Sequence, residues 1–199
     1  MLTNMDKLYE SVAANGPVCV GLDTEISYLP TTDTAKTAGE NVVAFNRALI
    51  DATKGVAGCY KVQIAYYESL GLDGMRAYAE TLNDCASQLS GTKVYSMVIP
   101  NHSEFGVPER VRNYYEEASQ RENTMAVNNT LSASITAVDI YDALNLHNNE
   151  DIYFDTDTHW APLGAFYAYE KFCEAAGVTP TTLDSFTKTS SDFTGYLAY

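Results

Sequence analysis

Short apolar runs alternate along the chain with segments whose apolar residues recur at helical spacing. The runs that predict strands are residues 17–23, 59–66, 93–100, 135–140 and 152–154. The segments that predict helices are residues 37–54, 75–89 and 162–176. Pro108 is expected to open a further helix, and Gly177 to close the last one. This alternation predicts an α/β protein with a mostly parallel sheet and flanking helices.

Ligand sites in sheets of this kind lie at the carboxyl ends of the strands. Three stretches of this sequence occupy such positions: Asp23, the residues after Ile99 and the residues after Phe154. The chemistry of the protein is therefore expected in these stretches.

Composition narrows the classes of partner. The 199 residues include 12 Lys and Arg against 26 Asp and Glu, for a net charge of −14, and 46% of them are hydrophobic. The apolar content excludes a disordered acidic tail, and the negative charge argues against nucleic acid and anionic membrane surfaces as partners. No run approaches the roughly 20 apolar residues of a membrane span, and the polar start is not typical of a signal peptide. We expect a soluble, cytoplasmic protein that acts, if at all, on a small molecule.

The four cysteines are scattered and include no C-x-x-C pair. Cys19 and Cys59 lie inside apolar strand-like runs, which predicts buried, reduced thiols. This cysteine usage fits a reducing cytoplasm.

The first chemical signature consists of four blocks in the N-terminal part: residues 21–23, 45–52, 60–68 and 71–81. In order and spacing they resemble the opening of orotidine 5′-phosphate decarboxylases of the longer bacterial type, over about the first 80 residues. The resemblance implies the start of a (β/α)8 barrel that forms UMP in pyrimidine biosynthesis without a cofactor. It also implies that Asp23 contacts the nucleotide and that Lys61 belongs to the catalytic array. The alternative is that both are ordinary charges at strand ends.

A decarboxylase of this kind needs more than these two residues. Loss of CO2 leaves a carbanion, which a cation must stabilise and a proton donor must quench. The family that this part resembles supplies both from an Asp-x-Lys-x-x-Asp motif at the end of strand 3. Residues 98–103 read Val-Ile-Pro-Asn-His-Ser here, and a full barrel takes about 250 residues. We interpret the segment as ancestry without decarboxylase activity.

The second signature is the Asp157-Thr158-His159 turn before the last predicted helix. A carboxylate so close to an imidazole can fix its tautomer and stabilise its cation, as in serine hydrolases. Helix capping or a surface hydrogen bond is an alternative. A metal site of Asp155, Asp157 and His159 is another, although no distant further ligand is evident.

The surroundings of this turn resemble the bacterial DHHW proteins, relatives of the SGNH-like domains of alginate O-acetyltransferases. The segments that carry the resemblance are residues 93–105, 138–144 and 151–170, within about residues 80–199. The resemblance implies that Asp157 orients His159, the base for a serine in a later Gly-Asp-Ser-like block. Thr158 departs from the usual histidine of the name motif, and no such block follows in this sequence. Ser103 is the one substitute nucleophile we can place, with a turn or cap serine as its alternative.

We therefore expect two pieces: residues 1–80 from a decarboxylase-like barrel and residues 81–199 from a partial DHHW/SGNH-like domain, joined near residues 77–82. Three hypotheses remain open: an inactive decarboxylase relative, an esterase or O-acetyltransferase fragment, and a non-enzymatic fusion of two truncated genes. No cofactor and no metal are expected. His147 is expected to be a solvated turn residue.

Overall fold

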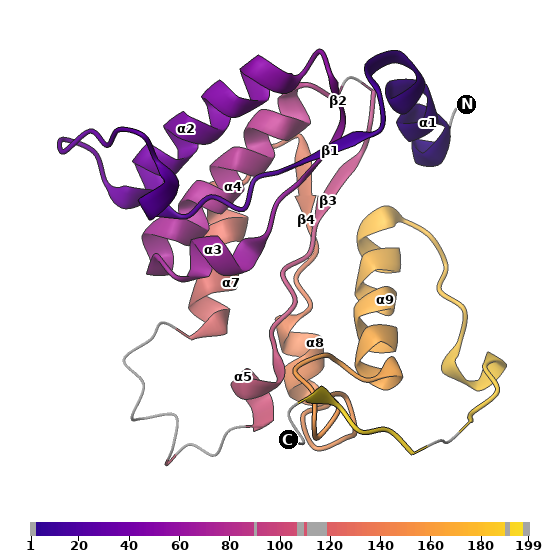
Figure 1. Cartoon of the computed structure of the whole chain (residues 1–199). Helices are drawn as coiled ribbons and strands as arrows, with labels where there is room; N and C mark the ends of the chain where they lie inside the picture. Colours follow the sequence, from indigo (N-terminus) through magenta and orange to yellow (C-terminus); the bar gives the residue numbers. More distant parts are fainter. Residues whose placement is uncertain (1–2, 90, 107–109, 111–118, 190–191, 197–199) are drawn as a thin grey trace. The chain divides into compact units, whose positions relative to one another are not determined.

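The computed structural model describes residues 3–89, 91–106, 110, 119–189 and 192–196. It divides into two compact units, whose helices and strands are labelled in Figure 1. The first comprises residues 1–94 and 122–135, and the second comprises residues 95–121 and 136–199. Each unit therefore combines segments that are separated along the chain.

The first unit is built around a small parallel sheet. Its elements are α1 (Asn4–Asn15), β1 (Val18–Gly21), the 3-10 helix η1 (Ile26–Tyr28), α2 (Ala38–Thr53), β2 (Ala57–Lys61), α3 (Ile64–Glu68), α4 (Gly71–Ser87) and most of α7 (Gln120–Thr130). Strands β1 and β2 pair in parallel. Capping boxes start two of the helices, because Thr3 and Asp6 cap α1 reciprocally, and Thr37 and Glu40 do the same for α2.

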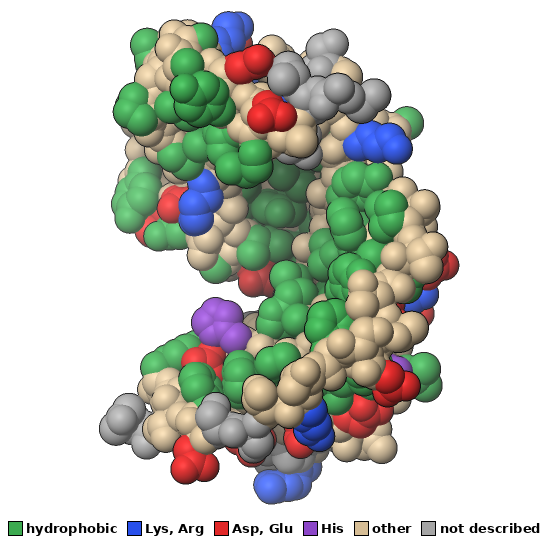
Figure 2. Space-filling model, turned by 90° about the vertical axis from the view of Figure 1, so that its right-hand side faces the viewer, with side chains coloured by type: hydrophobic (Ala, Val, Ile, Leu, Met, Phe, Trp, Pro, Cys, Tyr) green, Lys and Arg blue, Asp and Glu red, His purple; other side chains and the backbone are tan. Residues whose placement is uncertain are grey.

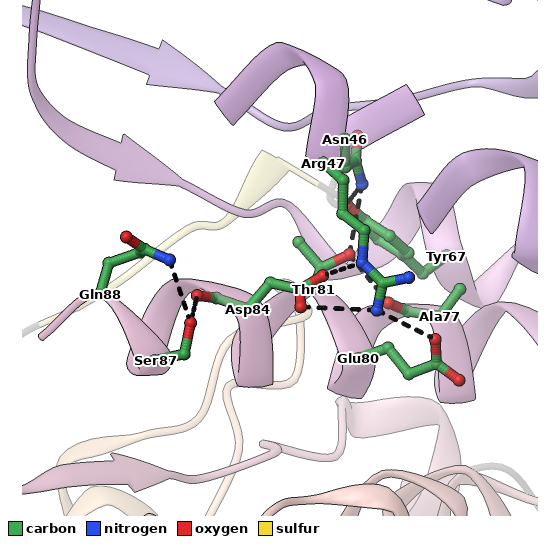
Figure 3. Close-up of polar contacts among 9 residues, drawn as sticks. All are labelled: Asn46, Arg47, Tyr67, Ala77, Glu80, Thr81, Asp84, Ser87 and Gln88. Atoms are coloured by element: carbon green, nitrogen blue, oxygen red, sulfur yellow. Dashed lines mark hydrogen bonds and ion pairs between the residues drawn. The ribbon is translucent and has the colours of Figure 1, made fainter. Parts of the chain in front are cut away.

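The core of the first unit contains an apolar cluster and a buried polar network. Val42, Val43, Tyr67 and Ala77 form the cluster, from helices α2, α3 and α4. Beside it, the Asn46 amide donates to the Tyr67 hydroxyl at 2.9 Å (Figure 3). That hydroxyl in turn donates to the Leu22 carbonyl at 2.9 Å. Burial raises the pKa of Tyr67 to about 12. The network thus ties the end of β1 to two helices.

The second unit holds α5 (His102–Gly106), α8 (Tyr141–Leu146), α9 (Pro162–Ala176) and the 3-10 helix η2 (Leu183–Ser185). A second two-stranded sheet pairs β3 (Val94–Ser96) with β4 (Ile135–Ala137), and the boundary of the units passes through both strands. The core residues of this unit are Val138, Ile140, Leu144, Ile152, Tyr153 and Ala168. Helix α9 begins with a proline and ends at Gly177, whose φ is 69°, as the sequence predicts.

The predicted α/β class, with a parallel strand pair and flanking helices, is confirmed, whereas several predicted strands are too long. Residues 64–68 form α3 instead of continuing β2, and β3 and β4 have three residues each. Residues 152–154 contribute only an isolated antiparallel bridge between Tyr153 and Trp160. A short apolar run does not by itself distinguish a strand from a buried helix, which explains the error at α3. The helix predicted from Pro108 lies outside the described residues.

Burial of the strand cysteines was predicted wrongly. Cys19 is exposed and Cys59 is half-buried, and Cys173 is the buried thiol. Strand β1 is largely exposed, because it belongs to a sheet with two strands in the described part of the chain.

Hydrophobic side chains reach the surface in both units. Tyr9 and Leu146 are each 76% exposed, and the face drawn in Figure 2 shows apolar side chains among polar ones. Within the described residues, no helix has the length and apolar character needed to cross a membrane.

Candidate functional site

The structure brings the two residues predicted in the N-terminal part together at the carboxyl ends of β1 and β2. Gly21 and Lys61 are register partners, and the Leu22 amide donates to the Lys61 carbonyl at 2.8 Å. Asp23 Oδ1 lies 3.9 Å from Lys61 Nζ, which also donates to Gln63 Oε1 at 2.9 Å. The side chains of Asp23 and Lys61 are 42% and 59% exposed. The pair is therefore a long ion pair at the sheet edge between partly exposed side chains, although Asp23 Oδ1 itself is buried and accepts no hydrogen bond from the described residues.

The predicted Asp-x-His pair lies on a tight turn in the second unit. The bridge between Tyr153 and Trp160 closes the turn, and the Ala161 amide donates to the Ile152 carbonyl at 2.8 Å. Helix α9 starts directly afterwards at Pro162. The turn therefore has its base fixed to a buried residue on one side and to a helix on the other.

Asp157 holds His159 through two contacts. Its Oδ1 accepts from the His159 backbone N–H at 2.9 Å and lies 2.5 Å from the ring Nδ1. The backbone N–H of His159, and then its ring, lower the pKa of Asp157. The carboxylate is nearly buried, with 11% of its side chain exposed, whereas the imidazole is 76% exposed. When Nδ1 donates to the carboxylate, the lone pair of neutral His159 is on Nε2.

A segment near the C-terminus holds this turn in place, and the sequence did not predict that contact. The Gly195 amide donates to Thr156 Oγ1 at 2.8 Å, and a Cβ at Gly195 would lie 2.2 Å from the Thr156 carbonyl oxygen. The hydroxyls of Thr158 and Tyr196 lie 2.5 Å apart. The unusual threonine of the motif therefore fixes the turn through Tyr196. The close approach of Gly195 is visible only in three dimensions.

Ser103 has the contacts of a turn serine, which was the predicted alternative to a nucleophile. Its backbone N–H and its hydroxyl both donate to Asn101 Oδ1, at 2.9 and 2.5 Å, and its oxygen accepts from Gln120 Nε2 at 3.1 Å. These contacts make it a turn serine at the start of α5.

The metal alternative is not supported. No cluster of three or more His, Cys, Asp or Glu side chains suited to a metal ion occurs among the described residues, so Asp155, Asp157 and His159 do not form one.

A second histidine–carboxylate pair lies nearby in the sequence. His147 Nδ1 is 2.6 Å from Glu150 Oε1, and the Tyr167 hydroxyl donates to Glu150 Oε2 at 2.7 Å. The pKa of Glu150 is lowered by these two partners. The His147 ring stacks on Tyr167 at 3.7 Å and its side chain is 29% exposed, so the prediction of a solvated residue was wrong. The i,i+3 spacing of His147 and Glu150 was the available signal.

Glu150 also lines a cavity of about 210 Å³ in the second unit, with His102, Phe105, Tyr153 and Asp155 among the other lining residues. The His102 ring lies parallel to that of Tyr153, with centroids 5.5 Å apart. The cavity is therefore lined by carboxylates, amides and aromatic rings.

The hydrogen bonds at Asp157 predict a pH dependence of stability. The folded state lowers the pKa of this carboxyl. Its contribution to the free energy of unfolding is therefore complete above the ordinary pKa of about 3.9, and it is lost as the pH falls through the lower pKa of the folded state. We expect the stability advantage of the wild type over Asp157→Asn to be constant near neutral pH and to vanish in acid. Urea unfolding between pH 8 and pH 2 measures it, with Asp155→Asn as the control for loss of one charge. An advantage that persists at the acid end contradicts the prediction.

Comparison with known proteins finds two sets of relatives. A family model described as DHHW protein matches residues 6–198. The crystal structure of a DHHW family protein from Eubacterium siraeum is 37% identical, with a TM-score of 0.51, and the match covers 57% of this chain and 37% of that one.

The other relatives are orotidine 5′-phosphate decarboxylases. Those of Clostridium kluyveri and Clostridium perfringens (strain SM101) are each 54% identical, over 82 and 80 residues. Each match covers 39% of this chain and 28% of the relative, so the chain spans about 28% of the length of these curated relatives. The resemblances to DHHW proteins and to orotidine 5′-phosphate decarboxylases are confirmed, and the DHHW match begins at residue 6 instead of near residue 80.

Proposed function

The chain belongs to the DHHW protein family, and from this premise we propose that Asp157 and His159 form the general base of a site for hydrolysis or transfer of small acyl esters. The observation that carries the proposal is the 2.5 Å contact between Asp157 Oδ1 and His159 Nδ1, with the rest of the imidazole open to solvent. It is the arrangement that a catalytic histidine needs: one nitrogen held and the other accessible.

The chemistry uses water or the hydroxyl of an acceptor as the nucleophile, because the Ser103 hydroxyl is engaged by Asn101 and Gln120. His159 Nε2 takes the proton as the oxygen attacks the acyl carbonyl. The tetrahedral intermediate then collapses, and the same nitrogen returns the proton to the leaving alkoxide. Asp157 stabilises the imidazolium between the two steps. This site needs no cofactor.

Replacement of His159 tests the proposal. We expect His159→Ala to lower the rate of 4-nitrophenyl acetate hydrolysis about 100-fold, since positioned general bases contribute at least this much. His147→Ala is the matched control, because His147 is also paired with a carboxylate through Nδ1 but is stacked on Tyr167. It should retain the wild-type rate. Equal losses in both variants, or no loss in His159→Ala, would overturn the proposal.

For the N-terminal part, we propose descent from the start of a decarboxylase barrel without its activity. The supporting observations are the 54% identity over 82 residues and the Asp23–Lys61 pair at adjacent strand ends. The pair alone supplies one ammonium group and neither a second cation nor a proton donor on a third strand. Incubation with orotidine 5′-phosphate should therefore yield no UMP by chromatography. UMP formation that Lys61→Ala abolishes would contradict this.

We also propose an origin for the two parts of the chain. Residues 1–80 would derive from the first units of a (β/α)8 barrel and residues 81–199 from an SGNH-like domain, joined by fusion of two truncated genes. Its support is the confinement of the decarboxylase matches to 82 and 80 residues, beside the DHHW match over residues 6–198. The decarboxylase resemblance also supports a cytoplasmic location. Sequencing the flanking DNA tests the fusion, since a continuous ancestral frame on both sides would contradict it.

A further inference from the structure

A bulge in the parallel sheet of the first unit brings two cysteines opposite each other. Val18 pairs with Ala57, but the register shifts by one residue and Cys19 then pairs with Cys59. Gly58 is the extra residue. A Cβ there would lie 2.7 Å from the Gly16 carbonyl oxygen and 2.9 Å from a Val12 methyl, so only glycine fits. Without the bulge Cys19 would face Gly58. The close contact with α1 therefore selects the cysteine pairing.

The two thiols are close enough to interact. Register partners on adjacent strands point to the same face, and strands about 4.8 Å apart fall within the Cα separation that a disulfide accepts. The pKa of Cys59 is raised, first by a hydrogen bond with the Cys19 thiol and then by burial. Cys19 is exposed, whereas Cys59 is half-buried. An oxidant in solution therefore reaches Cys19 more easily.

We propose that Cys19 and Cys59 are a thiol–disulfide exchange site that closes to a reversible cross-strand disulfide with low-molecular-weight disulfides of the glutathione class. The Cys19 thiolate attacks the small disulfide, forming a mixed disulfide and releasing one small thiol. The Cys59 thiolate then attacks the Cys19 sulfur and releases the second small thiol. Two electrons pass from the protein to the oxidant, and the two protons lost by the cysteines are taken up by the released thiolates.

The disulfide would connect the two strands whose ends carry Asp23 and Lys61. Cys59 lies two residues before Lys61, and Cys19 lies four before Asp23. Closure would thus hold the two strands that present the ion pair in one register. The site is independent of the proposed esterase chemistry, which belongs to the second unit.

Treatment of the reduced full-length protein with oxidised glutathione tests the proposal. After alkylation, peptide mapping by mass spectrometry without reduction should show one linked pair of peptides, containing Cys19 and Cys59, with two hydrogens lost. Cys85 and Cys173 should be found alkylated, because they stay free thiols during the treatment. Dithiothreitol should restore both thiols. Wild-type protein alone suffices for this readout, so it does not depend on the folding of any variant.

Two variants separate the steps. In Cys59→Ser the mixed disulfide at Cys19 has no resolving thiol, and we expect it to accumulate at least about tenfold over the wild type. Cys85→Ser, the matched control, should form the linked pair like the wild type. A mixed disulfide that persists on wild-type Cys19, a link between two chains, or full alkylation of both cysteines after treatment would overturn the proposal.

Discussion

Replacement of Gly74 by alanine is expected to destabilise the first unit by about 3 kcal/mol. Gly74 is buried in α4, and a Cβ there would lie 1.8 Å from the Tyr67 carbonyl oxygen and 2.7 Å from Leu70 Cβ. Because the clashing atom belongs to the backbone of α3, rotation of a side chain does not relieve it. The two helices would have to separate, which moves Tyr67 out of the core. The helix propensity gained by alanine, up to about 1 kcal/mol, offsets only part of this cost.

Urea unfolding followed by far-UV circular dichroism measures the loss, and hydrogen exchange of amides in α3 and α4 locates it. Gly55→Ala is the matched control, because nothing lies within 4 Å of its added Cβ and its φ is not positive. That variant should be as stable as the wild type or gain up to about 1 kcal/mol. Equal stability of the Gly55 and Gly74 variants would show that α3 and α4 do not pack as described.

Features set by neighbouring residues were predictable from the sequence. The apolar spacing of α2 and the Pro162 and Gly177 signals of α9 depend on local geometry, and both helices form where expected. The Asp157–His159 contact also spans a single turn. Each of these features depends on residues that are close together in the sequence.

Features that depend on distant segments were not predictable. The contact of Gly195 with Thr156 spans 39 residues. The pairing of Cys19 with Cys59 depends on a register shift at Gly58, a residue that α1 approaches closely. Residues 64–68 are apolar enough for a strand and form α3, where Tyr67 reaches the Leu22 carbonyl. In each case a tertiary contact overrides or adds to what the local pattern indicates.

Substitution of Asn46 by leucine is expected to cost about 3 kcal/mol, although leucine has a similar volume. Asn46 is 1% exposed. Its Oδ1 accepts from the Thr24 hydroxyl at 2.6 Å, and its Nδ2 donates to Tyr67 at 2.9 Å and to Thr81 at 3.3 Å. Leucine would leave the buried Thr24 hydroxyl without this acceptor and two oxygens without this donor. Each such group costs about 1–3 kcal/mol, partly offset by burial of the new apolar side chain.

Arg47, the next residue on α2, is the matched control for this substitution (Figure 3). It pairs with Asp84 at 2.6 Å and Glu80 at 4.0 Å, but its side chain is 55% exposed. Arg47→Ala should therefore cost no more than about 1 kcal/mol. A double-mutant cycle of Asn46→Leu with Tyr67→Phe, in urea unfolding, should give a coupling energy of about 1 kcal/mol, because each substitution removes the same hydrogen bond. If the costs of the two single substitutions simply add, the hydroxyl and the amide are not coupled, and the network does not hold β1 to α2 and α3.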